Sequence, residues 1–202
     1  ERVYFWQMEK NWKFSPLEII STVPTFGVDL ETRMTPELSF QYGAAFIPSM
    51  FQFATNSAFA DEGFNSMNGY KLRFEARAYV LRKPNRYFSA ELSFRHLIIN
   101  DDIRIGQEGD GNGNFAFFIN EQTNAHRLST QMNFKFGINK VCKSGFVVDF
   151  YSGVSLRRNS VHGMKTDAGG EVMPNWNIMG WELTPGHKFS YVTPIIGLKL
   201  GF

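Results

Sequence analysis

Two histidines are the residues of this chain whose chemistry best suits catalysis. His96 and His126 fall on the same face of two segments in which polarity alternates. Hydrolysis of an acyl ester would need a serine beside such a histidine, with an acidic group to orient the imidazole. Leu128 stands two residues after His126, however, and Ser129 falls on the opposite face. We therefore expect no catalytic residues and interpret both histidines as residues near strand ends.

Oxygen-bearing side chains in one glycine-rich segment have spacing that suits a cation. Asp110, Asn112 and Asn114 match the first half of a calcium-binding loop. The intervening glycines and the missing bidentate glutamate favour a flexible loop tip instead. Asp101 and Asp102 would assist a cation only if this segment folded back. We expect no metal and no cofactor.

The composition excludes several classes of protein. The chain has 202 residues and a formal net charge of +2, and it has no basic run, so nothing indicates a nucleic-acid partner. Its single cysteine, Cys142, rules out an internal disulfide framework. No apolar stretch approaches the roughly 20 residues of a transmembrane helix. The charged residues that follow Glu1 fit a mature chain whose export signal has been removed.

Alternation of apolar and polar residues is the dominant pattern along the chain. A period of two is typical of β-strands whose two sides face different surroundings. Short turns are expected at Thr35-Pro36, 82–86 and 139–145, and long loops at about 48–69, 100–123 and 158–187. An eighth strand is expected over Trp12–Ile20, with a β-bulge at Pro16. The seven clear strands are 26–33, 38–46, 70–80, 88–98, 126–138, 146–157 and 191–202.

The apolar face of these strands is too bulky to line a small barrel. An eight-stranded barrel has an interior only just wide enough to be filled by side chains. Phe26, Phe40, Phe74 and Phe94 belong to the apolar face, and they would crowd such an interior. Directed outward into lipid, they need no space inside.

The polar face carries both signs of charge on neighbouring strands, whereas the apolar face of the seven clear strands carries none. A Lys or Arg that faces the middle of a bilayer costs roughly 2–4 kcal/mol in barrels. Buried charges must be paired, so an ion-pair network would suit the interior. The predicted lumen charge network comprises Asp29, Glu31, Arg33, Arg73, Glu75, Arg77, Glu91, Arg95, Arg127, Lys135, Asp149, Arg157 and Lys199.

The turns are short at one end of the strands and the loops are long at the other, as in outer-membrane barrels. Tyr87, Phe88, Phe146 and Phe202 lie near the short turns and suit an aromatic girdle. The sequence predicts an all-β fold, a closed eight-stranded antiparallel up-and-down transmembrane β-barrel with short periplasmic turns and long extracellular loops. Residues 12–202 would form this single domain, after an N-terminal periplasmic segment, 1–11.

The hairpin from Thr25 to Gly43 and the ending from Gly197 to Phe202 resemble small outer-membrane β-barrel proteins common in Bacteroidota, of the OmpX/OmpA transmembrane type. The similarity covers nearly the whole chain from about Trp12, and its motifs are generic. The resemblance implies an integral location in the outer membrane of a Gram-negative envelope. It also implies that the barrel-assembly machinery reads Phe202 as an assembly signal. The chain departs from the OmpA pattern because no peptidoglycan-binding domain follows the barrel.

The predicted loops are unusually apolar for segments exposed to water, which indicates protein partners. We expect a non-enzymatic integral barrel with a plugged lumen that serves as an accessory subunit of a larger outer-membrane complex. Barrel assembly, secretion and nutrient uptake are the candidate complexes, and outer-membrane lipids would be further partners. The alternatives are a stand-alone envelope-stabilising or adhesive barrel and an outer-leaflet lipid-modifying enzyme. The loop interface candidates are Phe51, Phe53, Phe117, Phe118, Trp176 and Trp181.

Overall fold

The computed structural model describes an all-β chain with one short helix. It covers residues 10–19, 25–49, 66–80, 83–107, 116–142, 144–162, 171–172 and 188–202. The strands are β1 (Lys10–Phe14), β2 (Phe26–Arg33), β3 (Leu38–Ile47), β4 (Ser66–Val80), β5 (Lys83–Gln107), β6 (Phe117–Val141), β7 (Val147–His162), β8 (Glu171–Val172) and β9 (Lys188–Gly201). The helix, α1, spans Pro16–Ile19.

Eight of the strands form one closed ring of antiparallel pairings. Each strand from β1 to β6 pairs with the next one, β7 pairs with β9, and β9 returns to β1. The two-residue strand β8 stands outside the ring and pairs with β5. The ring closes where Lys13 pairs with Gly201, and the backbones of Trp12 and Phe202 exchange two hydrogen bonds of 3.1 and 3.0 Å. The sequence-based prediction of eight antiparallel strands is therefore confirmed.

The two faces of the ring keep the parity read from the sequence. Because side chains alternate along a strand, cross-strand partners in register share one face. Asp29 pairs with Gly43, Gly43 with Arg73, and Arg73 with Ser93, so a single row of inward positions crosses four strands. A register shift at Tyr79 is confined to the end of the β4–β5 pair. The ring thus has an inner polar face and an outer apolar face.

The predicted first strand is wrong in its second half. β1 ends at Phe14, and α1 begins at Pro16. Proline fits the first turn of a helix because the missing N–H would have no partner there, and Ser15 precedes it as an N-cap residue type. The Thr25 amide donates to the Glu18 carbonyl at 2.9 Å and ties the end of α1 to the start of β2. Pro16 therefore turns the chain out of the strand instead of forming a bulge within it.

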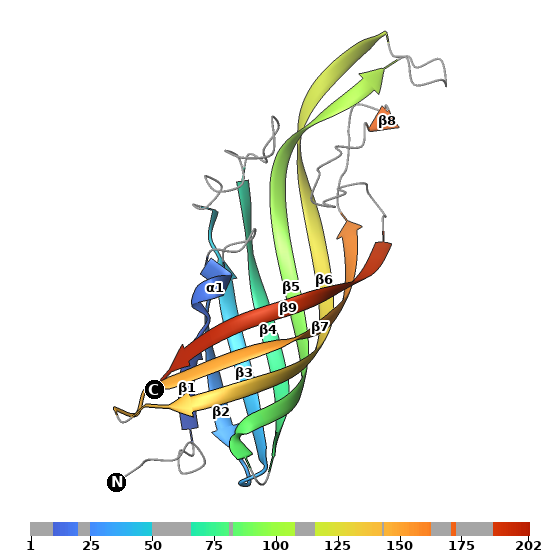
Figure 1. Ribbon diagram of the computed structural model, residues 1–202. Coiled ribbons are helices and arrows are strands. Elements are labelled where there is room, and N and C mark those ends of the chain that lie inside the picture. Colours follow the sequence, from blue (N-terminus) through green and yellow to red (C-terminus); the bar gives the residue numbers. More distant parts are fainter. Residues whose placement is uncertain are drawn as a thin grey trace.

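The predicted loop over 100–123 is also wrong, because much of it is strand. β5 and β6 pair without interruption from Arg86 with Ile138 to Gln107 with Phe117. Figure 1 shows that this hairpin extends well beyond the ends of the other strands. Phe117 and Phe118 consequently belong to β6 and not to a loop. Polar residues on both faces hid this extension, since strand pairing outside the ring needs no apolar face.

The turns predicted at Thr35-Pro36 and within 139–145 are present, whereas the turn predicted at 82–86 is wrong for residues 83–86, which belong to β5. Met34–Glu37 turns between β2 and β3, with the Thr35 hydroxyl accepting from the amide of Leu38 at 3.1 Å. Gly145 turns between β6 and β7 with a φ of 84°, a value that favours glycine. We call the end of the ring that holds these turns and Phe202 the turn end, and the opposite end the far end. No helix in the described ranges is long and apolar enough to cross a membrane.

Candidate functional site

The interior near the turn end is filled by buried charges of both signs. Twelve ion pairs join twelve described side chains into one connected set, with six cations and six carboxylates. The formal charges of this set therefore cancel. We call it the charge network: Lys13, Lys71, Arg73, Arg77, Lys135 and Lys199 with Glu18, Asp29, Glu31, Glu75, Glu91 and Asp149.

Arg77 lies at the centre of the charge network. Its guanidinium donates to both oxygens of Glu75 (2.9 and 3.2 Å), to Glu31 Oε2 (3.3 Å) and to Asp149 Oδ2 (2.7 Å). The Arg77 side chain is fully buried. A buried ion pair is tolerable only with good geometry and with further hydrogen bonds to each partner. Arg77 meets this requirement by joining carboxylates from three different strands.

Tyrosine hydroxyls and amides complete the coordination of the carboxylates. Tyr79 donates to Glu31 at 2.6 Å, and Tyr87 donates to Asp149 at 2.6 Å. Asn133 donates to Glu91 at 2.6 Å. These bonds occupy oxygen lone pairs that the cations leave open, which lowers the cost of burying the carboxylates.

Two glycines make room for this packing. A Cβ on Gly43 would overlap Asp29 Oδ1 and the side chain of Arg73, so only glycine leaves space for that ion pair. A Cβ on Gly137 would overlap the ring of Tyr87, which pairs with Gly137 across β5 and β6. A tyrosine ring laid over a cross-strand glycine fills the interior without a void.

Nine of the thirteen predicted network residues belong to the charge network, and the other four are arginines. Arg33 lies over the Tyr79 ring at 4.1 Å and donates to backbone carbonyls of the turn at Thr35 and Pro36. The other three, Arg95, Arg127 and Arg157, lie on the inner face toward the far end. We call them the arginine cluster.

Sequence reasoning missed three members of the charge network. Lys13 and Glu18 were missed because the alternation breaks at Pro16, and Lys71 was left out although it stands on the polar face of β4. Lys13 bonds Asp149 at 2.9 Å and Glu31 at 2.6 Å. The α1 residue Glu18 bonds Lys71 at 3.2 Å and Arg73 at 2.5 Å. The parity of Trp12 and Phe14 was a usable signal for Lys13.

The pKa of the Glu18 carboxyl reflects these neighbours. Burial on α1 would by itself raise the pKa, but the positive charges of Lys71 and Arg73 lower it to about 2. The carboxyl is therefore an anion at neutral pH. Glu18 is also the member of the charge network whose negative charge acts on Arg95 of the arginine cluster.

The outer face of the ring is apolar. Large side chains from every strand of the ring are exposed there, such as Trp12, Leu72, Phe134 and Phe150. Aromatic rings pack side by side, with Phe88 and Phe136 centroids 5.2 Å apart. Phe202, the predicted assembly signal, is 71% exposed at the turn end. A surface that exposes this much contiguous apolar area is unusual for a protein surrounded by water.

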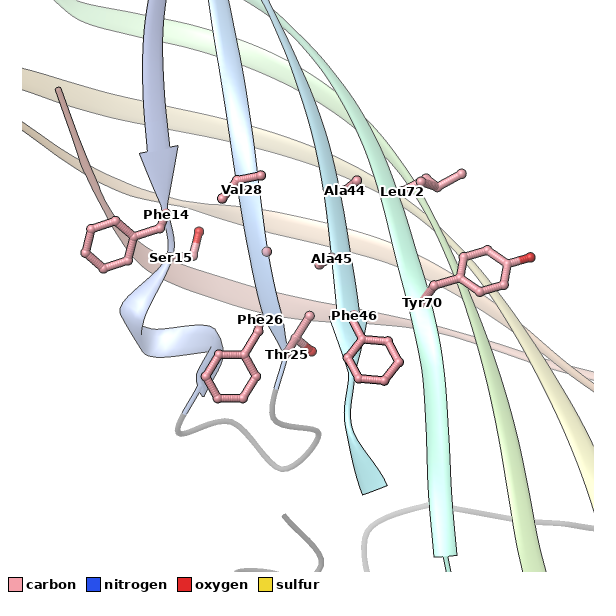
Figure 2. Close-up of a pocket in the computed structure, with 11 residues that line it drawn as sticks. Phe14, Ser15, Thr25, Phe26, Val28, Ala44, Ala45, Phe46, Tyr70 and Leu72 are labelled. Carbon is pink, nitrogen blue, oxygen red and sulfur yellow. The ribbon is translucent and has the colours of Figure 1, made fainter. Parts of the chain in front are cut away.

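A groove of about 710 Å³ hollows this outer face over β1 to β4. Figure 2 shows the aromatic rings of Phe14, Phe26, Phe46 and Tyr70 around it, one from each strand. Small residues, including Ala44, leave the space open. Among the described residues that line the groove, there is no carboxylate, histidine or cysteine. In this described part, the groove is a hollow in an apolar surface.

A row of polar side chains crosses the outer face near the far end. Ser160 Oγ and His162 Nε2 on β7 lie 2.7 Å apart, with His162 exposed and Ser160 half-buried. His126 pairs with His162 across β6 and β7, and its Nδ1 lies 3.2 Å from His96 Nε2. The sequence prediction expected a serine after a histidine, as tested at His126, whereas Ser160 stands two positions before His162. A serine two positions before a histidine would have been the signal for this pair.

Most of the remaining predicted sites lie outside the described residues. Phe51, Phe53, Trp176 and Trp181 lie outside the described residues, as do the calcium-like positions 110–114 and the side chain of Phe118. Phe117 is 49% exposed on β6. Within the described ranges, no three residues of the His, Cys, Asp and Glu types are grouped to hold a metal ion.

Comparison with protein-family models, with curated proteins and with solved structures found no match.

Proposed function

We propose that this chain is an integral outer-membrane protein, an eight-stranded up-and-down transmembrane β-barrel with a plugged lumen. The observation that carries the proposal is the inverted distribution of polarity. The largest fully buried side chains include Arg77, Lys13 and Lys199, whereas large apolar residues such as Leu92 and Phe88 are exposed. Water around the ring would oppose both halves of this arrangement, and lipid around the ring favours both.

The height of the apolar band supports the proposal. Outward residues of β7 are free of charge from Val148 to Leu156, and Arg158 follows. Nine strand residues span about 27 Å along the strand, or roughly 21 Å after a 40° tilt. Outer-membrane barrels carry an apolar band about 25 Å tall. Lys140 at the turn end and Arg158 and Lys188 toward the far end would then reach the interfaces, where long cations extend into water.

Arginine substitutions at two depths test the membrane location. Leu92 is 55% exposed near the middle of β5, and Ile138 is 37% exposed one outward position from Lys140. In lipid vesicles, L92R should lower the free energy of unfolding by about 2–4 kcal/mol, and I138R by about 0–1 kcal/mol. Urea titration followed by tryptophan fluorescence measures both. Equal, negligible costs at the two positions would contradict a lipid-facing surface.

The plugged lumen has its own test. Buried side chains from all parts of the charge network occupy the interior near the turn end, so no path for solutes is expected there. Purified chain in planar bilayers should give no large, stable single-channel openings. Frequent openings of uniform conductance would contradict the plug.

We further propose that the barrel is a non-enzymatic accessory subunit of a larger outer-membrane complex, docked through the β5–β6 hairpin. β5 and β6 each have 25 residues, more than twice the roughly 9–11 that a transmembrane strand needs. Phe117 and Ile119 are exposed on the projecting part, and exposed aromatic and aliphatic side chains are common anchors of interfaces. Barrel assembly, secretion and nutrient uptake remain the candidate complexes.

Extraction of the native chain in mild detergent, followed by native mass spectrometry, tests the docking. We expect a heteromeric species that is weakened by the double variant F117S/I119S. M34S is the matched control, because Met34 is an equally apolar exposed residue at the turn end. A chain that runs alone would contradict docking and would favour the stand-alone envelope-stabilising or adhesive barrel.

A lipid-modifying enzyme of the outer leaflet is a second candidate, favoured by the 2.7 Å contact between Ser160 and His162. A histidine at this distance can take the proton of a serine that attacks an acyl ester. The pair lies on the outer face, where lipid would reach it. Mass spectra of lipid A from cells with the wild-type chain, S160A and the outward control S152A test this candidate. Identical spectra in all three would contradict it.

A further inference from the structure

We propose that the interior of the ring toward the far end binds a phosphate-class oxyanion through the arginine cluster. The three arginines come from adjacent strands: Arg95 from β5, Arg127 from β6 and Arg157 from β7. In the register, Arg95 pairs with Ser129, which lies two residues from Arg127 on one side and two from Gln131 on the other. Gln131 pairs with Arg157. All three guanidinium groups therefore project from one patch of the inner wall.

Two arginines of the patch, Arg95 and Arg157, bring positive charge that no described ion pair balances. Among the described residues, no carboxylate forms an ion pair with Arg95 or Arg157. The carboxylate that acts on Arg95 is Glu18, which is already bonded to Lys71 and Arg73, while Arg157 and Arg127 act on Arg95 as like charges. This patch contrasts with the balanced charge network deeper in the ring.

Burial makes the charge of Arg95 costly. The Nε atom of Arg95 is buried with no hydrogen-bond partner in the described part of the chain. Buried apolar residues adjoin the patch, among them Leu97 and Ile99 on β5 and Val161 on β7. In such surroundings an anion interacts strongly with fixed cations, and unpaired cations are unfavourable.

The hydrogen bonds around Arg157 hold it ready for a ligand. Its Nη1 donates to the Tyr191 hydroxyl at 2.9 Å. Gln131, with its amide oxygen turned toward Arg157, accepts from Nε at 2.8 Å and from Nη2 at 3.1 Å. Each terminal nitrogen keeps a second N–H. The N–H groups of an arginine guanidinium bind two oxygens of a phosphate in paired hydrogen bonds, and a doubly charged anion matches the combined charge of Arg95 and Arg157.

Calorimetric titration of the full chain in detergent with inorganic phosphate and with pyrophosphate tests the proposal. We expect saturable binding that R95Q and R157Q weaken more than tenfold. R157K should weaken binding less, because lysine keeps the charge but loses the fork. R158Q is the matched control, since Arg158 neighbours Arg157 but is exposed on the outer face. Heat-modifiable gel mobility confirms that each variant is folded.

A second arm separates the two sources of phosphate. Chain reconstituted with a phosphomonoester lipid should resist competition by free phosphate if a lipid headgroup is the ligand, whereas a zwitterionic lipid should not bind the cluster. Absence of saturable binding to every phosphate compound, or equal affinities for R95Q and R158Q, would overturn the proposal. Because the titration is done in detergent, its failure is distinguishable from failure of the membrane assignment.

Discussion

Two halves of the same interior treat buried charge in opposite ways. Near the turn end, six cations meet six carboxylates, and Arg77 alone contacts Glu31, Glu75 and Asp149. Toward the far end, Arg95 and Arg157 have no carboxylate partner among the described residues. Both halves arise from one alternating pattern on the same strands. The parity of a residue therefore fixes which face it occupies, whereas its role depends on which charges the neighbouring strands bring beside it.

The comparison separates charges that stabilise from charges that bind. A balanced buried set contributes rigidity because each group fixes several others, and it has no demand for a further ligand. A set with more cations than carboxylates can still bind an anion. Substitutions in the two halves should consequently differ in sign as well as in size.

Removal of Arg77 should have the largest effect. R77L leaves three buried carboxylates with fewer cations, and the loss of one partner from a buried network costs about 3–5 kcal/mol. Urea unfolding in lipid vesicles measures the loss. The control is R86L, because Arg86 is exposed at the same end of the ring, and it should be nearly neutral. Similar stabilities of R77L and R86L would show that the charge network is not structural.

A side chain at Gly43 should rank second. G43V would force its Cβ into the Asp29 carboxylate and the Arg73 side chain. Overpacking of this kind costs about 1–3 kcal/mol, and disruption of the ion pair places the variant near the top of that range. A44V, one residue on and directed outward, is the matched control. The same thermal shift in both variants would contradict the close approach.

Substitution of Glu18 should give a smaller effect that depends on pH. The pKa of Glu18 is about 2 in the folded chain, against a usual value of 4.5. A lowered pKa contributes stability above about pH 4.5, and this contribution disappears as the pH falls toward 2. The shift corresponds to roughly 3 kcal/mol, and solvent screens part of it because the Glu18 side chain is 21% exposed. E18Q should therefore be about 2 kcal/mol less stable at pH 7 and nearly equal to the wild type near pH 2. A difference that stayed constant across this range would contradict the ion pairs with Lys71 and Arg73.

Neutralisation of Arg95 should have the smallest effect and the opposite sign. R95Q removes a positive charge that Arg157 and Arg127 repel, so without phosphate the variant should be unchanged or about 1 kcal/mol more stable. With phosphate present, the wild type should gain stability and R95Q should not. Unfolding measured with and without about 10 mM phosphate, a concentration that would occupy even a weak site, separates the two cases. A destabilised R95Q in phosphate-free buffer would place Arg95 in the structural half.

The sequence was sufficient for the faces of the ring because the period of two is a local property of a strand. Asp149 and Lys199 were predicted on the polar face, and they pair directly across β7 and β9. Which charges meet was not predictable, since Arg77 and Asp149 belong to strands that are not neighbours and touch only because the ring closes. Contacts across an interior depend on strand number and tilt, which the pattern of one strand does not contain.

The sequence predictions were wrong where tertiary contacts, and not the local pattern of residues, determine the structure. Pro16 was interpreted as a bulge, but it begins α1 and thereby carries Glu18 to Lys71. The extension of β5 and β6 was interpreted as a loop because the segment around Asp101 and Asp102 does not alternate. Paired strands outside a ring are held by backbone hydrogen bonds and need no apolar side. The Ser160–His162 contact was not predicted because the serine precedes its histidine in the sequence instead of following it.

The seam of the ring has a consequence for the order of folding. In the described residues, β1 and β9 share two register pairs and the two backbone bonds between Trp12 and Phe202, whereas β5 and β6 share a continuous run from Arg86 to Gln107. The long hairpin is local in sequence and can form early, and the seam must wait for the chain's opposite ends to meet. Lys13 is bonded to Asp149 directly behind the seam. This ion pair then stabilises the short pairing between β1 and β9 once it has formed.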